Sequence, residues 1–407
     1  MRVRFVPSCV LALLATAGAA FAQPGLQSRD LLKLRSVTSV QVSPDGTHVA
    51  YTVDNNDGAG RPYGQLWVMT IADGKTVRFG GDKEPSGNPE WSPDSQWIAY
   101  RGRVGEQSGL VIAKADGTGA RFLAEMTGTN APLPDSGRTI AWAPDGKRIA
   151  FVSSVPGPET ADATGDPMVI TRYLYKPDAA EGLTHFNDNR RLHLFVVDVA
   201  SGRVEPLTSG THYEHSIDWS PNGQEIVFLT NLAADDDEFF NYDIFALKLS
   251  DKSIRRITAT ENAEYRPRWS PDGRSIAFEA TKRGLTDRET TMEDTHVWVM
   301  NADGTNRREL GAALDNRQGP PEWAPDGRAL MVTVQDRGTV HLYRMPIAGG
   351  KPELLVGERG SVGAYSMAKT VLAYTLATPS MNSIVRSSIR LHEAASAPLN
   401  SPVSGSR

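Results

Sequence analysis

Three groups of side chains have types and spacing that chemistry could use. In the first, His212, Glu214 and His215 place two imidazoles and a carboxylate close together in the sequence, a combination found in zinc sites. In an extended strand, however, side chains alternate between the two faces, so His212 and Glu214 point one way and His215 the other. The pattern therefore favours hydrogen-bonded or exposed histidines, and we expect neither a metal nor a cofactor.

The second group is the acidic run from Asp235 to Glu238. Dense carboxylates raise the local negative potential and could attract an amino group or Ca²⁺. The spacing is not that of an EF-hand loop, and a solvated acidic loop explains it better.

The third group lies in a long insertion and comprises Arg172, Tyr173, Tyr175, Arg190 and Arg191. Guanidinium and aromatic groups suit contacts with a peptide. The same side chains would also suit packing of the insertion against the body of the protein. We assign no catalytic, cofactor-binding or metal-binding residue and name these five as candidate peptide contacts.

A repeated segment determines which elements hold these groups. Copies of [WV]-[SA]-P-[DN]-[GS], followed by an apolar strand, begin at Val42, Trp91, Trp142, Trp219, Trp269 and Trp323. Proline, Asp or Asn, and glycine in that order are typical of a tight turn, so each copy predicts a hairpin. A second hairpin follows in each copy, which makes four strands in about 50 residues, the size of one β-propeller blade.

The repeat predicts an all-β propeller. A worn seventh copy begins at Ala364, so we expect seven blades of four antiparallel strands, with the seventh incomplete. The tryptophans recur at one repeat position, which places them in the core between blades. The one long interval between repeats, from Pro144 to Pro221, locates the insertion in the third blade.

The N-terminus is typical of an export signal, with Arg2 and Arg4 before an apolar run and the small-x-small site Ala20-Phe21-Ala22. The predicted organisation is a signal peptide over 1–22, a helix and lead-in over 23–41, a propeller over 42–376 with the insertion at 154–191, and a Ser-rich tail over 377–407. We expect this tail to be disordered or truncated.

Composition limits the partners and the compartment. Cys9 is the only cysteine and lies inside the predicted signal, and the net charge is −5. We therefore expect a periplasmic or secreted protein with no nucleic-acid partner and no membrane anchor.

Two long stretches resemble a known family. The segment from Ile170 to Asn231 and the opening Asp30 to Val53 resemble the propeller of the prolyl oligopeptidase family, in its acylaminoacyl-peptidase and dipeptidyl-aminopeptidase-like branch. The turn repeat itself is also shared with TolB-like propellers. In that family of serine peptidases the propeller precedes an α/β-hydrolase domain with a serine nucleophile. These 407 residues contain no G-x-S-x-G elbow, so we expect the chain alone to be inactive.

Two functions follow as hypotheses. The first is the propeller part of an exported serine peptidase, which gates and binds peptide substrates without catalysing their cleavage. The alternative is a stand-alone TolB-like periplasmic propeller that binds a protein partner. The fold by itself does not separate the two.

Overall fold

The repeated Pro-Asp-Gly segments form the turns between the first two strands of each repeat in the computed structural model of the protein. In the fifth copy, the Ser270 hydroxyl donates to the Asp272 carboxylate at 2.6 Å, and the same carboxylate accepts the Arg274 N–H at 3.1 Å. Gly273 has a φ of 71°, a conformation that glycine adopts without steric cost. The predicted hairpins are confirmed.

The structure describes residues 27–58, 60–131, 137–157, 187–233, 241–281 and 294–378, and the backbone of 388–393 and 396–399. Among these residues no helix is long and apolar enough to cross a membrane.

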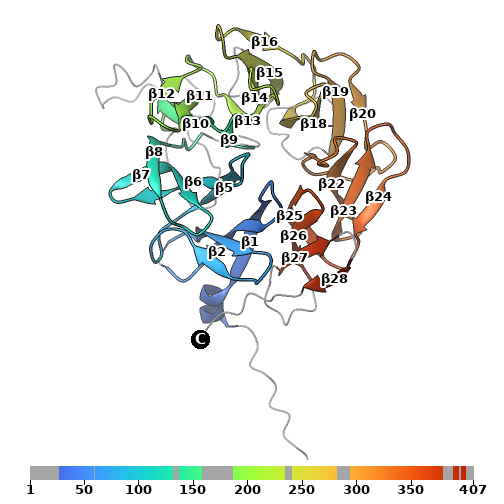
Figure 1. Ribbon diagram of the computed structural model, residues 1–407. Helices are drawn as coiled ribbons and strands as arrows, with labels where there is room; N and C mark the ends of the chain where they lie inside the picture. Colours follow the sequence, from blue (N-terminus) through green and yellow to red (C-terminus); the bar gives the residue numbers. More distant parts are fainter. Residues whose placement is uncertain are drawn as a thin grey trace, which may run out of the picture.

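Each repeat forms four antiparallel strands, arranged around a common centre (Figure 1). A short 3₁₀ helix, η1 (Ser28–Lys33), precedes them. The first three sheets contain β1 (Arg35–Val42), β2 (His48–Asn55), β3 (Tyr63–Thr70), β4 (Thr76–Arg78); β5 (Gly87–Trp91), β6 (Trp97–Val104), β7 (Gln107–Lys114), β8 (Arg121–Glu125); β9 (Ile140–Trp142), β10 (Arg148–Pro156), β11 (Arg190–Asp198) and β12 (Val204–Pro206).

The remaining repeats continue the ring in the same order. They contain β13 (His215–Trp219), β14 (Glu225–Thr230), β15 (Asp243–Lys248), β16 (Ile254–Arg256); β17 (Glu264–Trp269), β18 (Ser275–Thr281), β19 (Thr295–Asn301), β20 (Arg308–Glu309); β21 (Glu322–Trp323), β22 (Ala329–Asp336), β23 (Thr339–Pro346), β24 (Glu353–Val356); and β25 (Ser361–Ala368), β26 (Val371–Ala377), β27 (Ser388–Glu393) and β28 (Ser396–Leu399).

The all-β propeller is confirmed, but the prediction of seven separate blades is wrong. Five sheets have four strands, whereas β21–β28 form one eight-stranded sheet. The last two repeats are joined because Val340 of β23 pairs in parallel with Ser361 of β25. The propeller therefore has six blades, of which the sixth is twice as wide as the others.

Three expected boundaries differ from the observed strands. The first blade begins at Arg35, within the predicted lead-in 23–41. The insertion is shorter than predicted, since β10 extends to Pro156 and β11 begins at Arg190. In the tail 377–407, β27 pairs with β26 and β28 with β27, so the last repeat has four strands and is not incomplete. The sequence of β27, Ser-Ile-Arg-Leu-His-Glu, alternates polar and apolar residues as a strand does.

The ring closes without exchange of a strand between the two ends of the chain. All strands of the first sheet come from the first repeat, and β1 lies beside β25 and β26 (Figure 1). The Val42 N–H donates to the Ser366 hydroxyl at 3.0 Å. Apolar side chains including Val40, Tyr51 and Val371 bury one another across this junction. Side-chain packing and the hydrogen bond from Val42 to Ser366 therefore help to hold the first and last repeats together.

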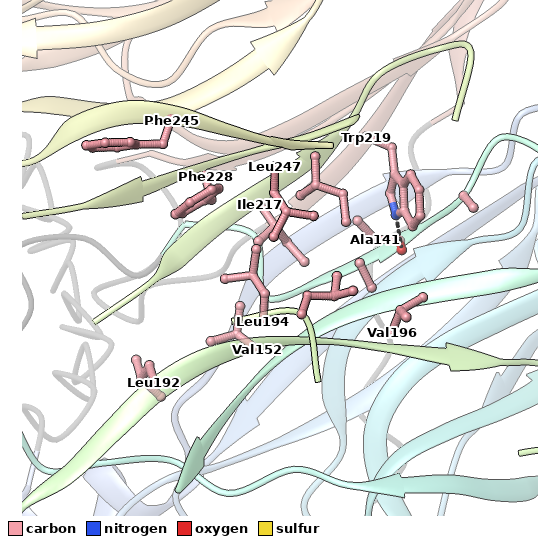
Figure 2. Packing of buried hydrophobic residues seen from close by; sticks show 14 of the residues in the cluster. Ala141, Val152, Leu192, Leu194, Val196, Ile217, Trp219, Phe228, Phe245 and Leu247 are labelled. Atoms are coloured by element: carbon pink, nitrogen blue, oxygen red, sulfur yellow. Dashed lines mark hydrogen bonds between the residues drawn. The ribbon is translucent and has the colours of Figure 1, made fainter. Parts of the chain in front are cut away.

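The core lies between neighbouring sheets rather than inside any one of them. Figure 2 shows the cluster between the third and fourth sheets, where Val152 and Leu194 meet Ile217 and Phe228. Leu194 and Ile217 have no exposed surface. Each sheet must bury both faces in this way, which explains why the second strands are almost continuously apolar.

The repeat tryptophans fasten each sheet to the one before it. The indole N–H of Trp142 donates to the Glu90 carbonyl at 3.0 Å. Trp91, Trp219 and Trp323 make the same contact, to the carbonyls of Gln41, Ala141 and Arg268 at 3.0 to 3.1 Å; the bond of Trp219 is drawn in Figure 2. The predicted place of these side chains between blades is confirmed.

Trp269 is the exception and provides a matched control. Among the described residues its buried indole nitrogen has no hydrogen-bond partner, although its exposure of 7% is close to the 8% of Trp142. Trp142→Phe and Trp269→Phe remove the same volume, but only the first removes a hydrogen bond. We expect Trp142→Phe to lower the free energy of unfolding by about 1 kcal/mol more than Trp269→Phe. Urea unfolding measures both, and equal losses would contradict the role of the bond.

Candidate functional site

The residue before each repeat tryptophan lies on the innermost strand and is frequently charged. The charged residues at this position are Glu90 in β5, Asp218 in β13, Arg268 in β17 and Glu322 in β21. Because side chains alternate along a strand, this residue faces the opposite way from the tryptophan, toward the following repeat. In the third repeat the position is Ala141, and Arg138, just before β9, supplies the charge. We call these five residues the inner charge cluster.

Contacts within the inner charge cluster run from one repeat to the next. Arg138 Nε lies 2.9 Å from Glu90 Oε1, and Arg138 Nη1 lies 2.6 Å from Asp218 Oδ1. The other Asp218 oxygen accepts the Trp269 backbone N–H at 2.8 Å. Arg268 Nε lies 3.5 Å from Glu322 Oε1. Alternating charges thus link the second to sixth sheets near the centre of the ring.

The pKa values of the cluster depend both on burial and on the charges of its other members. Burial raises the pKa of both Glu90 and Asp218, and the nearby Arg138 and Arg268 partly offset the rise. Burial alone would lower the pKa of Arg138, but the attraction of Glu90 and Asp218 outweighs it, so the net shift is upward. A buried cation between two carboxylates is stable only in this paired form.

The two arginines of the cluster differ in how fully they are used. Arg138 is held between two carboxylates, whereas Arg268 has one at 3.5 Å. Within the described part of the chain, Arg138 Nε, Arg268 Nε and Arg268 Nη1 are buried without a hydrogen bond of good geometry, and the Arg268 side chain is 11% exposed. The cluster thus brings three carboxylates and two guanidinium groups together near the centre of the ring.

Three of the innermost strands have a β-bulge next to the cluster. Asn88, Ser216 and Arg266 each precede a repeat tryptophan by three residues and have φ between 50° and 59°. Each lies at a register shift of the innermost strand. Left-handed conformations are strained for residues other than glycine and, like bulges, are common near binding sites.

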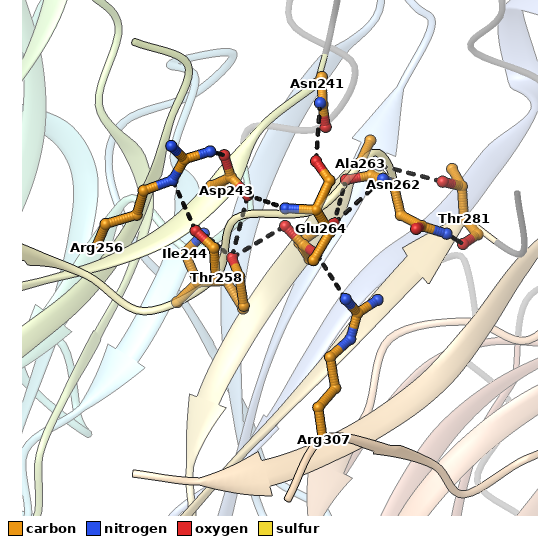
Figure 3. Close-up of polar contacts among 11 residues, drawn as sticks. Asn241, Asp243, Ile244, Arg256, Thr258, Asn262, Ala263, Glu264, Thr281 and Arg307 are labelled. Carbon is orange, nitrogen blue, oxygen red and sulfur yellow. Dashed lines mark hydrogen bonds and ion pairs between the residues drawn. The ribbon is translucent and has the colours of Figure 1, made fainter. Parts of the chain in front are cut away.

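A second polar network lies between the fourth and fifth sheets (Figure 3). Glu264 has no exposed surface and accepts hydrogen bonds from Thr258 at 3.1 Å and Thr260 at 2.6 Å. Arg307 Nη1 lies 3.8 Å from the same carboxylate. Burial, and to a lesser extent the charge of Asp243, raises the pKa of Glu264 to about 8 despite these contacts.

The equivalent position one repeat earlier explains the histidine group. Glu214 accepts a hydrogen bond from Thr208 at 3.0 Å and contacts His193 Nδ1 at 2.5 Å. His215 is fully buried and meets the Tyr242 ring edge-on at 4.8 Å. Across the described ranges, no three His, Cys, Asp or Glu side chains are grouped so that they could hold a metal ion. The acidic run 235–238 lies outside the described residues.

Two of the five candidate peptide contacts can be placed. Arg190 donates to the Ser154 hydroxyl at 2.7 Å and to Thr127 Oγ1 at 3.2 Å. Arg191 is fully buried, donates to the Thr211 carbonyl at 2.7 Å and lies over the Tyr213 ring. Both guanidinium groups therefore fasten the end of the insertion to the propeller. Arg172, Tyr173 and Tyr175 lie outside the described residues.

Sequence reasoning missed the inner charge cluster. The signal was present, because a charged residue stands directly before the tryptophan in four of the repeats, at Glu90, Asp218, Arg268 and Glu322. A charge is unusual in an otherwise apolar strand unless it is paired. Arg138 carried no such signal, since it lies outside the repeat pattern.

Comparison with known proteins gives one curated relative. The chain is 29% identical over 227 residues to the uncharacterized peptidase YuxL of Bacillus subtilis (strain 168), a match that covers 54% of this chain and 33% of that protein. The matched part thus spans about a third of the length of the relative. No family model matches the chain.

Solved structures share the fold at low sequence identity. The acylaminoacyl peptidase of Pyrococcus horikoshii matches with a TM-score of 0.66 and 15% identity, over 91% of this chain and 53% of that one. An acylaminoacyl peptidase in complex with Z-Gly-Gly-Phe-chloromethyl ketone matches with a TM-score of 0.69 and 15% identity, over 92% and 54%. The β-propeller domain of the Trilobed protease from Pyrococcus furiosus matches at 0.61 and 14%, over 92% and 99%. The chain thus resembles the N-terminal propeller of these peptidases.

Loss of the central cation should destabilise the protein strongly. Arg138→Gln leaves the buried carboxylates of Glu90 and Asp218 unpaired, which we expect to cost about 3 kcal/mol of unfolding free energy at neutral pH. The cost should be smaller at pH 5, where carboxyl groups with raised pKa take up protons. Lys75→Gln, which removes an exposed ion pair, should leave stability unchanged. Chemical unfolding at both pH values tests this, and equal effects of the two variants would contradict it.

Glu264 should make stability depend on pH. The folded protein holds the Glu264 proton up to a pH of about 8, whereas the ordinary value of this pKa is 4.5. The unfolded chain therefore loses the proton first, and stability falls as pH rises from 4.5 to 8, by at most about 1.4 kcal/mol per pH unit. Glu264→Gln should flatten this slope in urea unfolding measured across the window. The exposed Glu353→Gln serves as control, and an unaltered slope in Glu264→Gln would refute the assignment.

Proposed function

We propose that this chain is the substrate-binding propeller of an exported peptidase of the prolyl oligopeptidase type. It binds peptides near the centre of the ring and admits them to a hydrolase domain. The similarity to a curated peptidase over 227 residues carries this proposal. The likeness to the acylaminoacyl peptidase propellers supports the fold that such a role needs.

The inner charge cluster supplies the recognition in this proposal. A peptide main chain offers carbonyl oxygens and N–H groups, which match the partly exposed Arg268 guanidinium and Glu322 carboxylate. The strong pairing of Arg138 keeps the cluster in place. Preorganised polar groups of this kind bind without reordering the protein.

The role predicts binding without turnover. The purified chain should bind a fluorescent N-blocked Gly-Gly-Phe peptide in an anisotropy titration, and it should not hydrolyse N-blocked or free aminoacyl reporters. Arg268→Gln and Glu322→Gln should each weaken binding about tenfold, the effect of about 1.4 kcal/mol from one lost hydrogen bond to a charged group. Glu353→Gln on the outer strand β24 should bind like the wild type.

The outcomes separate this function from the alternative. A chain that binds no peptide but captures a folded protein would instead be a stand-alone binding propeller. Turnover that a serine-directed inhibitor blocks would contradict the expected lack of catalysis. An unchanged peptide affinity in both cluster variants would show that the peptide binds elsewhere than at the centre of the ring.

A further inference from the structure

A pocket of about 360 Å³ lies inside the eight-stranded sheet, where its two repeats meet. Arg337 and Gly338 line it from the turn between β22 and β23, and Arg359 and Gly360 from the connection between β24 and β25. Thr339, Ser361, Ala377 and Thr378 complete the lining.

The strand pairing explains why a hollow forms here. From Leu342 onward, β24 pairs with the edge of β23. Strand β25 can therefore reach that edge only at its first residue, where Val340 pairs with Ser361 and donates to the Gly360 carbonyl at 3.1 Å. The two repeats separate on either side of this pair, so the hollow is a consequence of joining two blades in one sheet.

The charged groups that line the pocket are both cationic. Arg359 is exposed and has no ion-pair partner among the described residues. Arg337 is 94% exposed, and its Nε lies 3.6 Å from Asp336 Oδ1, beyond hydrogen-bonding distance. Asp336 and Glu358, the acidic neighbours of the two arginines in sequence, do not line the pocket. Among the described residues that line the pocket, two are thus arginines and none carries a carboxylate.

Of the hydroxyl groups on Thr339 and Ser361, one is available as a further donor. The Thr339 hydroxyl is occupied, because it donates to the Asp336 carbonyl at 2.5 Å. The Ser361 hydroxyl has no hydrogen-bond partner within the described part of the chain. Gly338 has open space where a side chain would be, which leaves room for a ligand beside Arg337. Two planar guanidinium groups and a hydroxyl are the donors that carboxylates and phosphates accept from.

We propose that this pocket binds an oxyanion, the carboxylate or phosphate group of a small ligand, between Arg337 and Arg359 with Ser361 as a third donor. The site is separate from the inner charge cluster and does not depend on the proposed peptidase role.

Affinity labelling tests the site directly. Cys9 is the only cysteine, so Cys9→Ser with Ser361→Cys places one thiol in the pocket. Iodoacetate and iodoacetamide alkylate a thiolate by the same displacement of iodide and differ in charge. The ratio of their rates therefore reports attraction of a carboxylate, whereas a change in thiol pKa affects both reagents equally.

Arg359→Gln and Arg337→Gln should each lower the iodoacetate to iodoacetamide ratio about fivefold, the effect of one charge contact at about 4 Å in water. Arg203→Gln, which removes an exposed arginine from the turn between β11 and β12, should leave the ratio unchanged. A ratio that neither pocket variant lowers would overturn the proposal.

Competition distinguishes the two sources of the oxyanion. Protection of the thiol by succinate alone indicates a carboxylate ligand, and protection by inorganic phosphate alone indicates a phosphate ligand. Equal protection by sodium chloride at the same ionic strength would show screening only and overturn the proposal. If the cysteine variant does not fold, the wild type supplies the test: succinate or phosphate should raise its Tm, and this rise should disappear in Arg359→Gln.

Discussion

The contact between the repeat tryptophan and the preceding sheet is the constraint on which this structure depends. A sheet in the ring has two apolar faces and no solvent-facing side, so it is stable only when both neighbours cover it. The indole packs against the preceding sheet, and its N–H donates a hydrogen bond to a carbonyl of the innermost strand there, as Trp142 does to Glu90. Where the first and last repeats meet, Val42 and Ser366 replace this contact with a backbone-to-hydroxyl bond.

The same constraint places the inner charge cluster. With the tryptophan turned toward one neighbour, the residue before it must face the other, at the inner edge of the sheet. Charged residues at this position are desolvated and need partners from adjacent repeats, which Arg138 provides for Glu90 and Asp218. The cluster therefore exists only when the ring is assembled. It is the polar site on which the proposed binding of a peptide rests, in a chain that matches about half the length of the acylaminoacyl peptidases.

Polar residues at the junctions between sheets have two different roles. Glu264 and Glu214 sit at equivalent positions and each accept a threonine hydroxyl, which fixes the start of one repeat against the end of the previous one. Arg190 and Arg191, which we had considered for ligand contacts, likewise fasten the base of the insertion. Arg337 and Arg359 differ, because they line a pocket and fasten no neighbouring sheet in the described part of the chain.

The sequence by itself determined the repeat, its turns and the burial of its tryptophans, because each follows from local chemistry: a Pro-Asp-Gly turn, strand alternation and a recurring apolar position. It also indicated a resemblance to the peptidase propellers. Only the tertiary structure decided that the last two repeats share one sheet, since the pairing of Val340 with Ser361 depends on how β24 occupies the edge of β23. It also decided that Arg138 joins charges from separate repeats, because residues 80 positions apart meet only when neighbouring sheets pack together.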